Sequence, residues 1–313
     1  MHLVVPYAAA PGDAGARALQ GLRLPQLQRL LARLTPGATT ATDAQSLNLP
    51  HEHVLAACRG WALRDGHLPL AAWQAQADGI AAVPGALGWA LLTPTHWQVG
   101  SDGIVLLDPA ALHLAEDESR ALWRSLCPLF ESEGWALHWA APLRWYVAHA
   151  SLADLASASL DRVVGRGIDQ WLPDRHAGRI VRRLQSEAQM LLYTHPVNAA
   201  REARGELAVN SIWLSGTGRT QAVAPGSIEP VVDARLRDPW LAGDGAGWAE
   251  AWAQLDAQRL GELDARAARG EMVSLTLCGE HLAQRFDTVR RGAWQRLTLR
   301  WRQAGAAKVL EAL

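Results

Sequence analysis

Short apolar runs and helically spaced leucines follow one another along the chain, and this pattern predicts a mixed α/β fold. Residues 2–7 form an apolar run that predicts a first strand. In residues 24–34, leucines recur at spacings of three and four, and Pro36-Gly37 ends the predicted helix. A strand followed by an amphipathic helix is the opening of an α/β unit.

The next part of the chain predicts a loop, a helix and a domain boundary. Residues 39–50 are small and polar, which indicates a loop, and a helix is predicted over residues 51–61. Glycine and proline interrupt the pattern at residues 79–88 and again at 94–103. We therefore place a domain boundary near residue 98.

Residues 99–207 have the pattern of a small α+β module of the split β-α-β kind. Ala141-Pro142 predicts a hairpin turn between its last two strands. Its predicted elements are strands at 104–107, 135–139 and 145–148 and helices from about 115 and over 176–193.

Beyond this module the α/β pattern returns. The predicted elements are strands at 210–214, 272–277 and 297–301, a long helix over 248–268 and a short C-terminal helix. The expected fold is thus an α/β core formed by residues 1–98 and 208–313, with an inserted α+β domain at 99–207.

Composition and charge narrow the class of protein. The 313 residues are 49% hydrophobic, which allows a substantial core, and 30 basic residues nearly balance 31 acidic ones. A nucleic-acid partner would need a clustered positive face, so none is expected. The three cysteines follow no metal or disulfide pattern, no apolar run approaches 18 residues, and no signal peptide is evident, which favours a cytoplasmic protein without a membrane partner.

Residues 190–218 concentrate side chains suited to an anionic ligand. Arginine can clamp a carboxylate or phosphate, asparagine offers neutral donors and acceptors, and histidine can donate a proton. A Gly-x-Gly after a predicted strand could cradle an anion with backbone N–H groups, although it equally fits a sharp turn at the end of a strand. The other residues could likewise cap or tie an irregular segment. The candidate ligand-binding residues are His195, Asn198, Arg201, Asn210, Gly216 and Gly218.

Candidates for catalysis and for metal binding are weaker. Thr42, Asp43 and Ser46 lie in the predicted loop but have no nucleophile signature such as G-x-S-x-G. The run at residues 51–53, His-Glu-His, does not match H-E-x-x-H. Residues 280–281, Glu-His, are interpreted as the start of a surface helix. No metal site is therefore predicted from the residues.

The string HPVNAAREARGELAVNSIWLSGTG resembles the archaeal-type, cofactor-independent phosphoglycerate mutases, whose pattern is approximately H-P-x-N-x-x-R-x-x-x-G-x-x-x-A-N followed by a short strand and G-x-G. It is also similar to a shorter bacterial set that carries the mutase name or that of a pathogenicity regulator of the RpfE type. The resemblance implies a metal-binding, alkaline-phosphatase-like core with an inserted α+β domain that holds substrate.

Departures from the family pattern shape the functional prediction. The mutases have a metal-binding Asp followed by Gly after the first strand, where this chain has Tyr7-Ala8. Their nucleophile is a Ser in a Gly-Ser-Asp segment, where the nearest equivalent is Thr42-Asp43. Their later Asp/His metal cluster has no convincing counterpart after Met272.

We therefore expect a non-catalytic relative without a cofactor. It would bind a small phosphorylated or carboxylated metabolite or a protein partner, with a regulatory role. The alternatives are an active mutase or phosphatase that uses Thr42 or Ser46 with a divalent metal, and a pure protein-interaction module.

Overall fold

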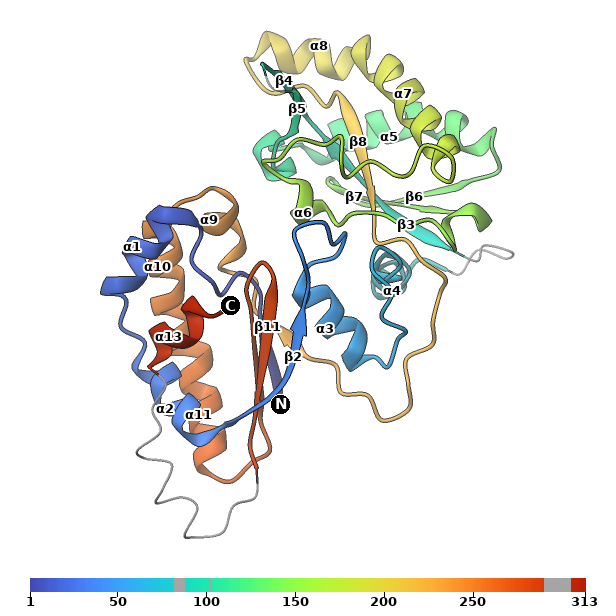
Figure 1. The fold of residues 1–313 in the computed structure, drawn as a ribbon. Coiled ribbons are helices and arrows are strands. Elements are labelled where there is room, and N and C mark those ends of the chain that lie inside the picture. The colour runs from blue at the N-terminus through green and yellow to red at the C-terminus, as the bar shows by residue number, and fades with distance from the viewer. Residues whose placement is uncertain (82–87, 102, 290–304) are drawn as a thin grey trace. The chain divides into compact units, whose positions relative to one another are not determined.

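The computed structural model describes residues 1–81, 88–101, 103–289 and 305–313, and the chain forms two compact units (Figure 1). The first unit contains Met1–Ala44, Leu49–Gly60 and Ala224–Leu313, and the second contains Gln45–Asn48 and Trp61–Val223. The chain thus leaves the first unit, builds the second and returns. The main crossings lie at residues 60/61 and 223/224, whereas the sequence pattern placed the boundaries at 98/99 and 207/208.

The first unit is built on a five-stranded mixed sheet. β1 is parallel to both of its neighbours, and β11 is antiparallel to both of its own. The strand order is β2 (Thr35–Ala41), β11 (Leu282–Asp287), β10 (Ser274–Cys278), β1 (His2–Val5) and β9 (Val231–Val232).

Alternation along β1 places helices on both faces of this sheet (Figure 1). Leu3 and Val5 join the larger apolar core, while Val4 points to the other face, toward α3 (Pro50–Cys58). The helices on the larger core are α1 (Gly12–Gly21), α2 (Pro25–Arg33), α10 (Gly245–Leu255), α11 (Gly261–Ala268) and α13 (Ala306–Glu311), and α9 (Arg237–Leu241) precedes α10.

A π-helical turn, Asp256–Leu260, joins α10 to α11 and anchors α2. The buried Asp256 carboxylate accepts the backbone N–H groups of Gln26 (3.0 Å) and Leu27 (2.7 Å) in the first turn of α2. No residue near α2 in the sequence supplies this cap, so a side chain about 230 residues away satisfies these otherwise unpaired donors.

The second unit has a four-stranded antiparallel sheet covered on both faces. Its strand order is β6 (Ala136–Ala141), β7 (Arg144–Ala148), β3 (Trp89–Thr95) and β8 (Ser211–Ser215). Helices α5 (Glu116–Glu131) and α7 (Arg179–Tyr193) pack on one face, and α4 (Leu70–Ala77) packs on the other. The remaining elements are the hairpin β4 (Trp97–Gly100) and β5 (Gly103–Leu106), α6 (Leu160–Val163), α8 (Pro196–Ala203) and 3₁₀ turns at Pro109–Leu112 and Ala150–Leu152.

The α/β class and the hairpin at Ala141-Pro142 are confirmed. Two local predictions are wrong, and one strand was not predicted. Residues 39–41 belong to β2 rather than to a loop, and Glu280-His281 leads into β11 rather than into a helix. The apolar run of β3 was missed because both of its faces are covered, which removes the alternation that marks a strand.

The strand predicted at 297–301 lies outside the described residues. Within the described ranges, no helix is long and apolar enough to cross a membrane.

Candidate functional site

Tyr7, the second residue after β1, is held in an unusual backbone conformation at the carboxyl edge of the first unit's sheet. Tyr7 has φ of 60°, a left-handed value that is uncommon for a residue with a side chain, and it is 5% exposed. Its ring lies 5.6 Å from that of His51 and 5.4 Å from that of Trp240, centroid to centroid. Trp248 Nε1 donates to the Tyr7 carbonyl (3.0 Å). The Tyr7 ring, which stands where the resemblance would place a metal-binding Asp, is therefore held by contacts within the protein.

Thr42 and Asp43 follow β2 at the same edge. Because β2 and β10 are both antiparallel to β11, β2 is parallel to β10 and β1, and the three carboxyl ends lie together. The Thr42 N–H donates to the His281 carbonyl (2.8 Å), and its hydroxyl lies 3.5 Å from the Glu280 carbonyl. In open α/β sheets ligands bind at such carboxyl ends, so this edge is the candidate ligand site of the first unit.

The third catalytic candidate, Ser46, belongs to the second unit. The sequence grouped it with Thr42 because only four positions separate them. The chain changes unit between the two residues, so proximity in sequence does not establish a common site.

The residues of this edge do not fit the metal centre that the resemblance implies. Across residues 1–81, 88–101, 103–289 and 305–313, no three side chains of His, Cys, Asp or Glu converge as metal ligands. Tyr7 supplies a phenol in place of the carboxylate that a hard divalent cation prefers.

Asn198 points into the second unit and is 3% exposed. Its amide nitrogen donates to the carbonyls of Leu192 (2.8 Å) and Val209 (2.7 Å), and its oxygen accepts the Val209 N–H (2.8 Å). These bonds join the end of α7 to the segment that enters β8. Both amide donors are occupied by protein.

Arg201 is likewise turned inward and is 1% exposed. Its Nε donates to the Leu207 carbonyl (2.8 Å), Nη1 donates to the Glu118 carboxylate, and Nη2 donates to the Leu112 carbonyl. The guanidinium thus connects α8, the segment after it, the first turn of α5 and the turn before α5. Its counter-ion is Glu118, a residue of this chain.

His195 and Asn210 each hold nearby backbone in place through hydrogen bonds. His195 caps α8: its Nδ1 accepts the Val197 N–H (3.2 Å), and its Nε2 lies 2.8 Å from Ser125 Oγ. Burial lowers the pKa of His195, which favours the neutral ring that this capping bond requires. Asn210 bridges the backbone of Trp97, accepting its N–H (2.7 Å) and donating to its carbonyl (2.9 Å).

The Gly216-Thr217-Gly218 loop is packed against backbone. Gly218 has φ of 144°, and a Cβ there would lie 2.4 Å from the His67 carbonyl oxygen, so only glycine fits. The Thr217 hydroxyl, which is 0% exposed, lies within hydrogen-bond distance of Leu155 O (2.6 Å), Ser157 Oγ (2.8 Å) and Gly66 O (3.2 Å). Both glycines serve close packing in the structure described.

The end of α7 presents large apolar side chains to solvent. Met190 is 73% exposed, Leu191 is 44% exposed and Tyr193 is 86% exposed. The stretch that was predicted to hold an anion therefore turns its polar groups inward and three large apolar side chains outward. Solitary exposed apolar residues are common, whereas a neighbouring group of them marks a candidate binding surface.

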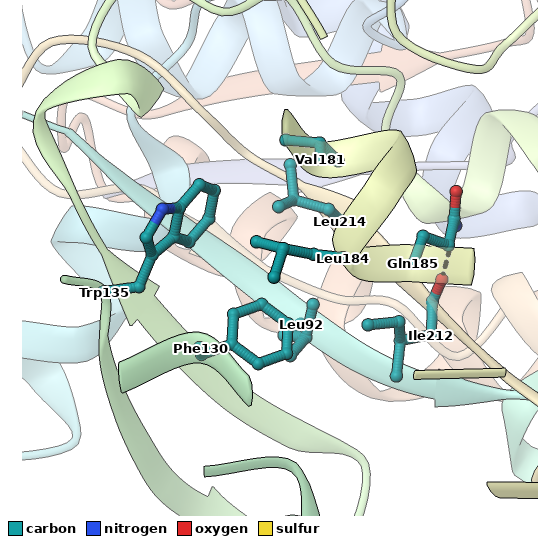
Figure 2. A pocket seen from close by; sticks show the side chains of 8 residues that line it. All are labelled: Leu92, Phe130, Trp135, Val181, Leu184, Gln185, Ile212 and Leu214. Atoms are coloured by element: carbon teal, nitrogen blue, oxygen red, sulfur yellow. Dashed lines mark hydrogen bonds between the residues drawn. The ribbon is translucent and has the colours of Figure 1, made fainter. Parts of the chain in front are cut away.

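The second unit also encloses a small apolar cavity between its sheet and helices α5 and α7 (Figure 2). The Gln185 amide is turned away from the cavity to donate to the Ile212 carbonyl (2.8 Å). The cavity has about 10 Å³ of room, roughly enough for one water molecule, so it is a packing gap rather than a ligand site. The remaining lining residues are Leu92, Phe130, Trp135, Val181, Leu184, Ile212 and Leu214.

The sequence did not reveal the ring contacts of Tyr7 or the inward direction of Asn198 and Arg201. A residue held at positive φ leaves no mark in a hydrophobicity pattern. The His-Pro pair was the available signal for the cap, because Pro at the first position of a helix often follows a capping residue.

No family model matches this chain, and no curated protein does. Among solved structures, the cofactor-independent phosphoglycerate mutase of Thermoplasma acidophilum DSM 1728 is similar over 91% of this chain and 89% of its own, with 15% identity and a TM-score of 0.38. The PH0037 protein of Pyrococcus horikoshii is similar over 92% of this chain and 87% of its own, with 11% identity and a TM-score of 0.46.

Proposed function

We propose that this chain is a non-catalytic relative of the cofactor-independent phosphoglycerate mutases that acts by binding a protein partner in a regulatory role. The proposal starts from the sequence resemblance of residues 195–218 and from the departures at Tyr7 and Thr42. Its main support is the state of Tyr7, whose ring and carbonyl are both held by protein contacts at the edge where the family places a metal ligand.

Phosphoryl transfer through a side-chain phosphate requires neutralisation of the charge that develops on the phosphoryl oxygens. At this edge Tyr7 takes the place of a carboxylate, and a threonine, Thr42, takes the place of the nucleophilic serine. A phenol held between two rings cannot anchor a divalent cation as a carboxylate does. These residues favour binding over turnover.

The direction of the side chains in residues 190–218 favours a macromolecular partner. The donors of Asn198 and Arg201 are bonded to the protein's own carbonyls and to Glu118, while Met190 and Tyr193 face solvent. A small anion at Arg201 would have to displace Glu118. The anion-binding role of His195, Asn198, Arg201 and Asn210 stays a prediction. At Arg201 it requires the displacement of Glu118.

An enolase-coupled mutase assay with added Mn²⁺ tests the absence of turnover. The wild-type protein, Thr42→Ala and the exposed-strand control Thr39→Ala should all give the background rate. Turnover that is lost in Thr42→Ala and with a chelator, but kept in Thr39→Ala, would establish an active mutase and overturn the proposal.

A paired capture experiment tests the partner surface. Wild type should retain specific proteins from lysate that the double variant Met190→Glu/Tyr193→Glu loses, while Arg179→Glu, earlier on the same helix, keeps them. Identical capture by all three proteins contradicts this surface. Thermal-shift measurements with 3-phosphoglycerate address the small-ligand alternative, and concentration-dependent stabilisation would favour it.

A further inference from the structure

The start of α7 carries three arginines that have no acidic partner. Arg175, in the turn before the helix, and Arg179 are exposed, and Arg182 is half-buried. Within the described part of the chain, none of the three forms an ion pair, whereas the next arginine, Arg183, bonds Glu133 (2.6 Å). The three guanidinium groups thus form a basic surface on the second unit.

The arginines of this basic surface are placed against the helix dipole. The N-terminal end of a helix carries a partial positive charge, so acidic residues stabilise it and cations destabilise it. The first turn of α5 follows this rule with Glu116, Asp117 and Glu118, whereas the first turn of α7 has Arg179 and Arg182 and no acid. A local rule that is broken without a compensating contact marks a candidate functional position.

The acidic residue of the preceding turn is used by the turn itself. Asp174 Oδ1 accepts the N–H groups of His176 (2.8 Å) and Ala177 (3.0 Å), and these bonds hold the pKa of Asp174 below its usual range. Arg182 Nε donates to the Pro173 carbonyl (2.7 Å). With three arginines beside one carboxylate, the basic surface keeps a net positive charge.

We propose that the basic surface binds an acidic segment of a protein partner. Positions 175, 179 and 182 are four and three residues apart, and a Gly178 N–H to Asp174 carbonyl bond (2.7 Å) continues the helical path into the turn. The three side chains therefore share a face whose spacing suits carboxylates three and four positions apart on a partner helix. Each arginine can bond a carboxylate in a bidentate way, and the partner's negative charge also complements the dipole.

The size and the surroundings of the basic surface favour an acidic protein over other anionic partners. A nucleic acid needs positive charge spread along its backbone, and this chain has a formal net charge of −1. A membrane would also use apolar contacts, but the exposed Met190 and Tyr193 lie about three turns further along α7. The basic surface is separate from that proposed partner surface, so Arg179→Glu should keep the proteins captured there and lose the acidic partner.

Fluorescence anisotropy with labelled octaglutamate tests the proposal on the full chain. At low salt, wild type should bind octaglutamate at least tenfold more tightly than octaglutamine, and added salt should weaken this binding. Arg175→Gln/Arg179→Gln should bind octaglutamate at least tenfold more weakly than wild type. The control Arg266→Gln/Arg269→Gln removes the same charge from two arginines that bond Glu271 in the first unit, and it should bind as wild type does.

Three results would overturn the proposal. They are equal affinity of wild type for the two peptides, equal affinity of wild type and Arg175→Gln/Arg179→Gln for octaglutamate, and binding of wild type to octathymidylate or to phosphatidylserine vesicles as tight as to octaglutamate. The last result would assign the surface to nucleic acid or to lipid.

Thermal unfolding separates a binding role from a structural one. Removing the repulsion between the arginines and the helix dipole should leave the unfolding midpoint of Arg175→Gln/Arg179→Gln at or above that of wild type at low salt. A lower midpoint would show that the arginines stabilise the fold, and it would contradict the proposal.

Discussion

Arg201 on α8 donates from Nη1 to the carboxylate of Glu118 on α5, and the guanidinium is 1% exposed. The two residues are 83 positions apart in sequence, and the pair joins their helices. Glu118 lies in the first turn of α5, where a negative charge also complements the helix dipole. The residue with the strongest sequence signal for anion binding therefore already has an anion.

Replacing Arg201 with Ala should lower the free energy of unfolding by about 1–3 kcal/mol, because the carbonyls of Leu112 and Leu207 would lose this donor and Glu118 would keep only one of its two arginines, Arg204. Arg204→Ala is the matched control. Arg204 bonds the same Glu118 but is 48% exposed, and its loss should cost at most about 1 kcal/mol. Urea denaturation measures both values. A different result would show that Arg201 binds a ligand. In that case Arg201→Ala would have the wild-type free energy of unfolding, and added phosphate would stabilise wild type but not the variant.

The same substitution at two buried threonines should have different effects. Thr217→Val removes a hydroxyl that lies beside three oxygen partners and should cost about 1–3 kcal/mol. The Thr93 hydroxyl is buried and has no hydrogen-bond partner among the described residues, so Thr93→Val should be neutral or stabilise by up to about 1 kcal/mol. Chemical denaturation compares them, and an equal loss at both sites would show that Thr93 has a partner such as a bound water.

Stability should fall as the pH is lowered from about 6.5 to about 4, in part because of His2. Burial, with a contribution from Arg285, lowers the pKa of His2 to about 4, below the ordinary value of about 6.5 in an unfolded chain. Between these values the unfolded chain binds the proton and the folded chain does not, so acid favours unfolding. Above pH 6.5 both states are neutral and the effect is absent.

Unfolding free energies across this pH range should fall less steeply in His2→Gln than in wild type. His176→Gln changes an exposed histidine and should keep the wild-type slope. Equal slopes in wild type and His2→Gln would mean that His2 takes up its proton in the folded state as readily as in the unfolded chain.

Asp256→Ala should destabilise the first unit by about 1–2 kcal/mol, because two N–H groups at the start of α2 would lose their acceptor. Asp256→Asn keeps an oxygen in place and should cost less. Amide exchange of Gln26 and Leu27 gives a local readout. Unchanged exchange in Asp256→Ala would contradict the capping role.

Much of the fold was predictable because its signals are local. The leucine spacing in α2 and the Pro-containing turn between β6 and β7 each follow from residues within one element. β3 was not predictable in this way, since coverage of both faces by α4, α5 and α7 removes its alternation. The boundary near residue 98 was placed on the glycine and proline of residues 94–103, whereas β3, which precedes it, pairs with β7 and β8 in one sheet.

The sequence by itself determined the α/β class, most helices and the hairpin, because periodicity is set by neighbouring residues. It also identified residues 190–218 as the most specific part of the chain. Only the tertiary structure decided the direction of those residues. Whether Arg201 faces a ligand or the protein depends on a carbonyl and a carboxylate from distant segments, Leu112 and Glu118, which must be paired once they are buried.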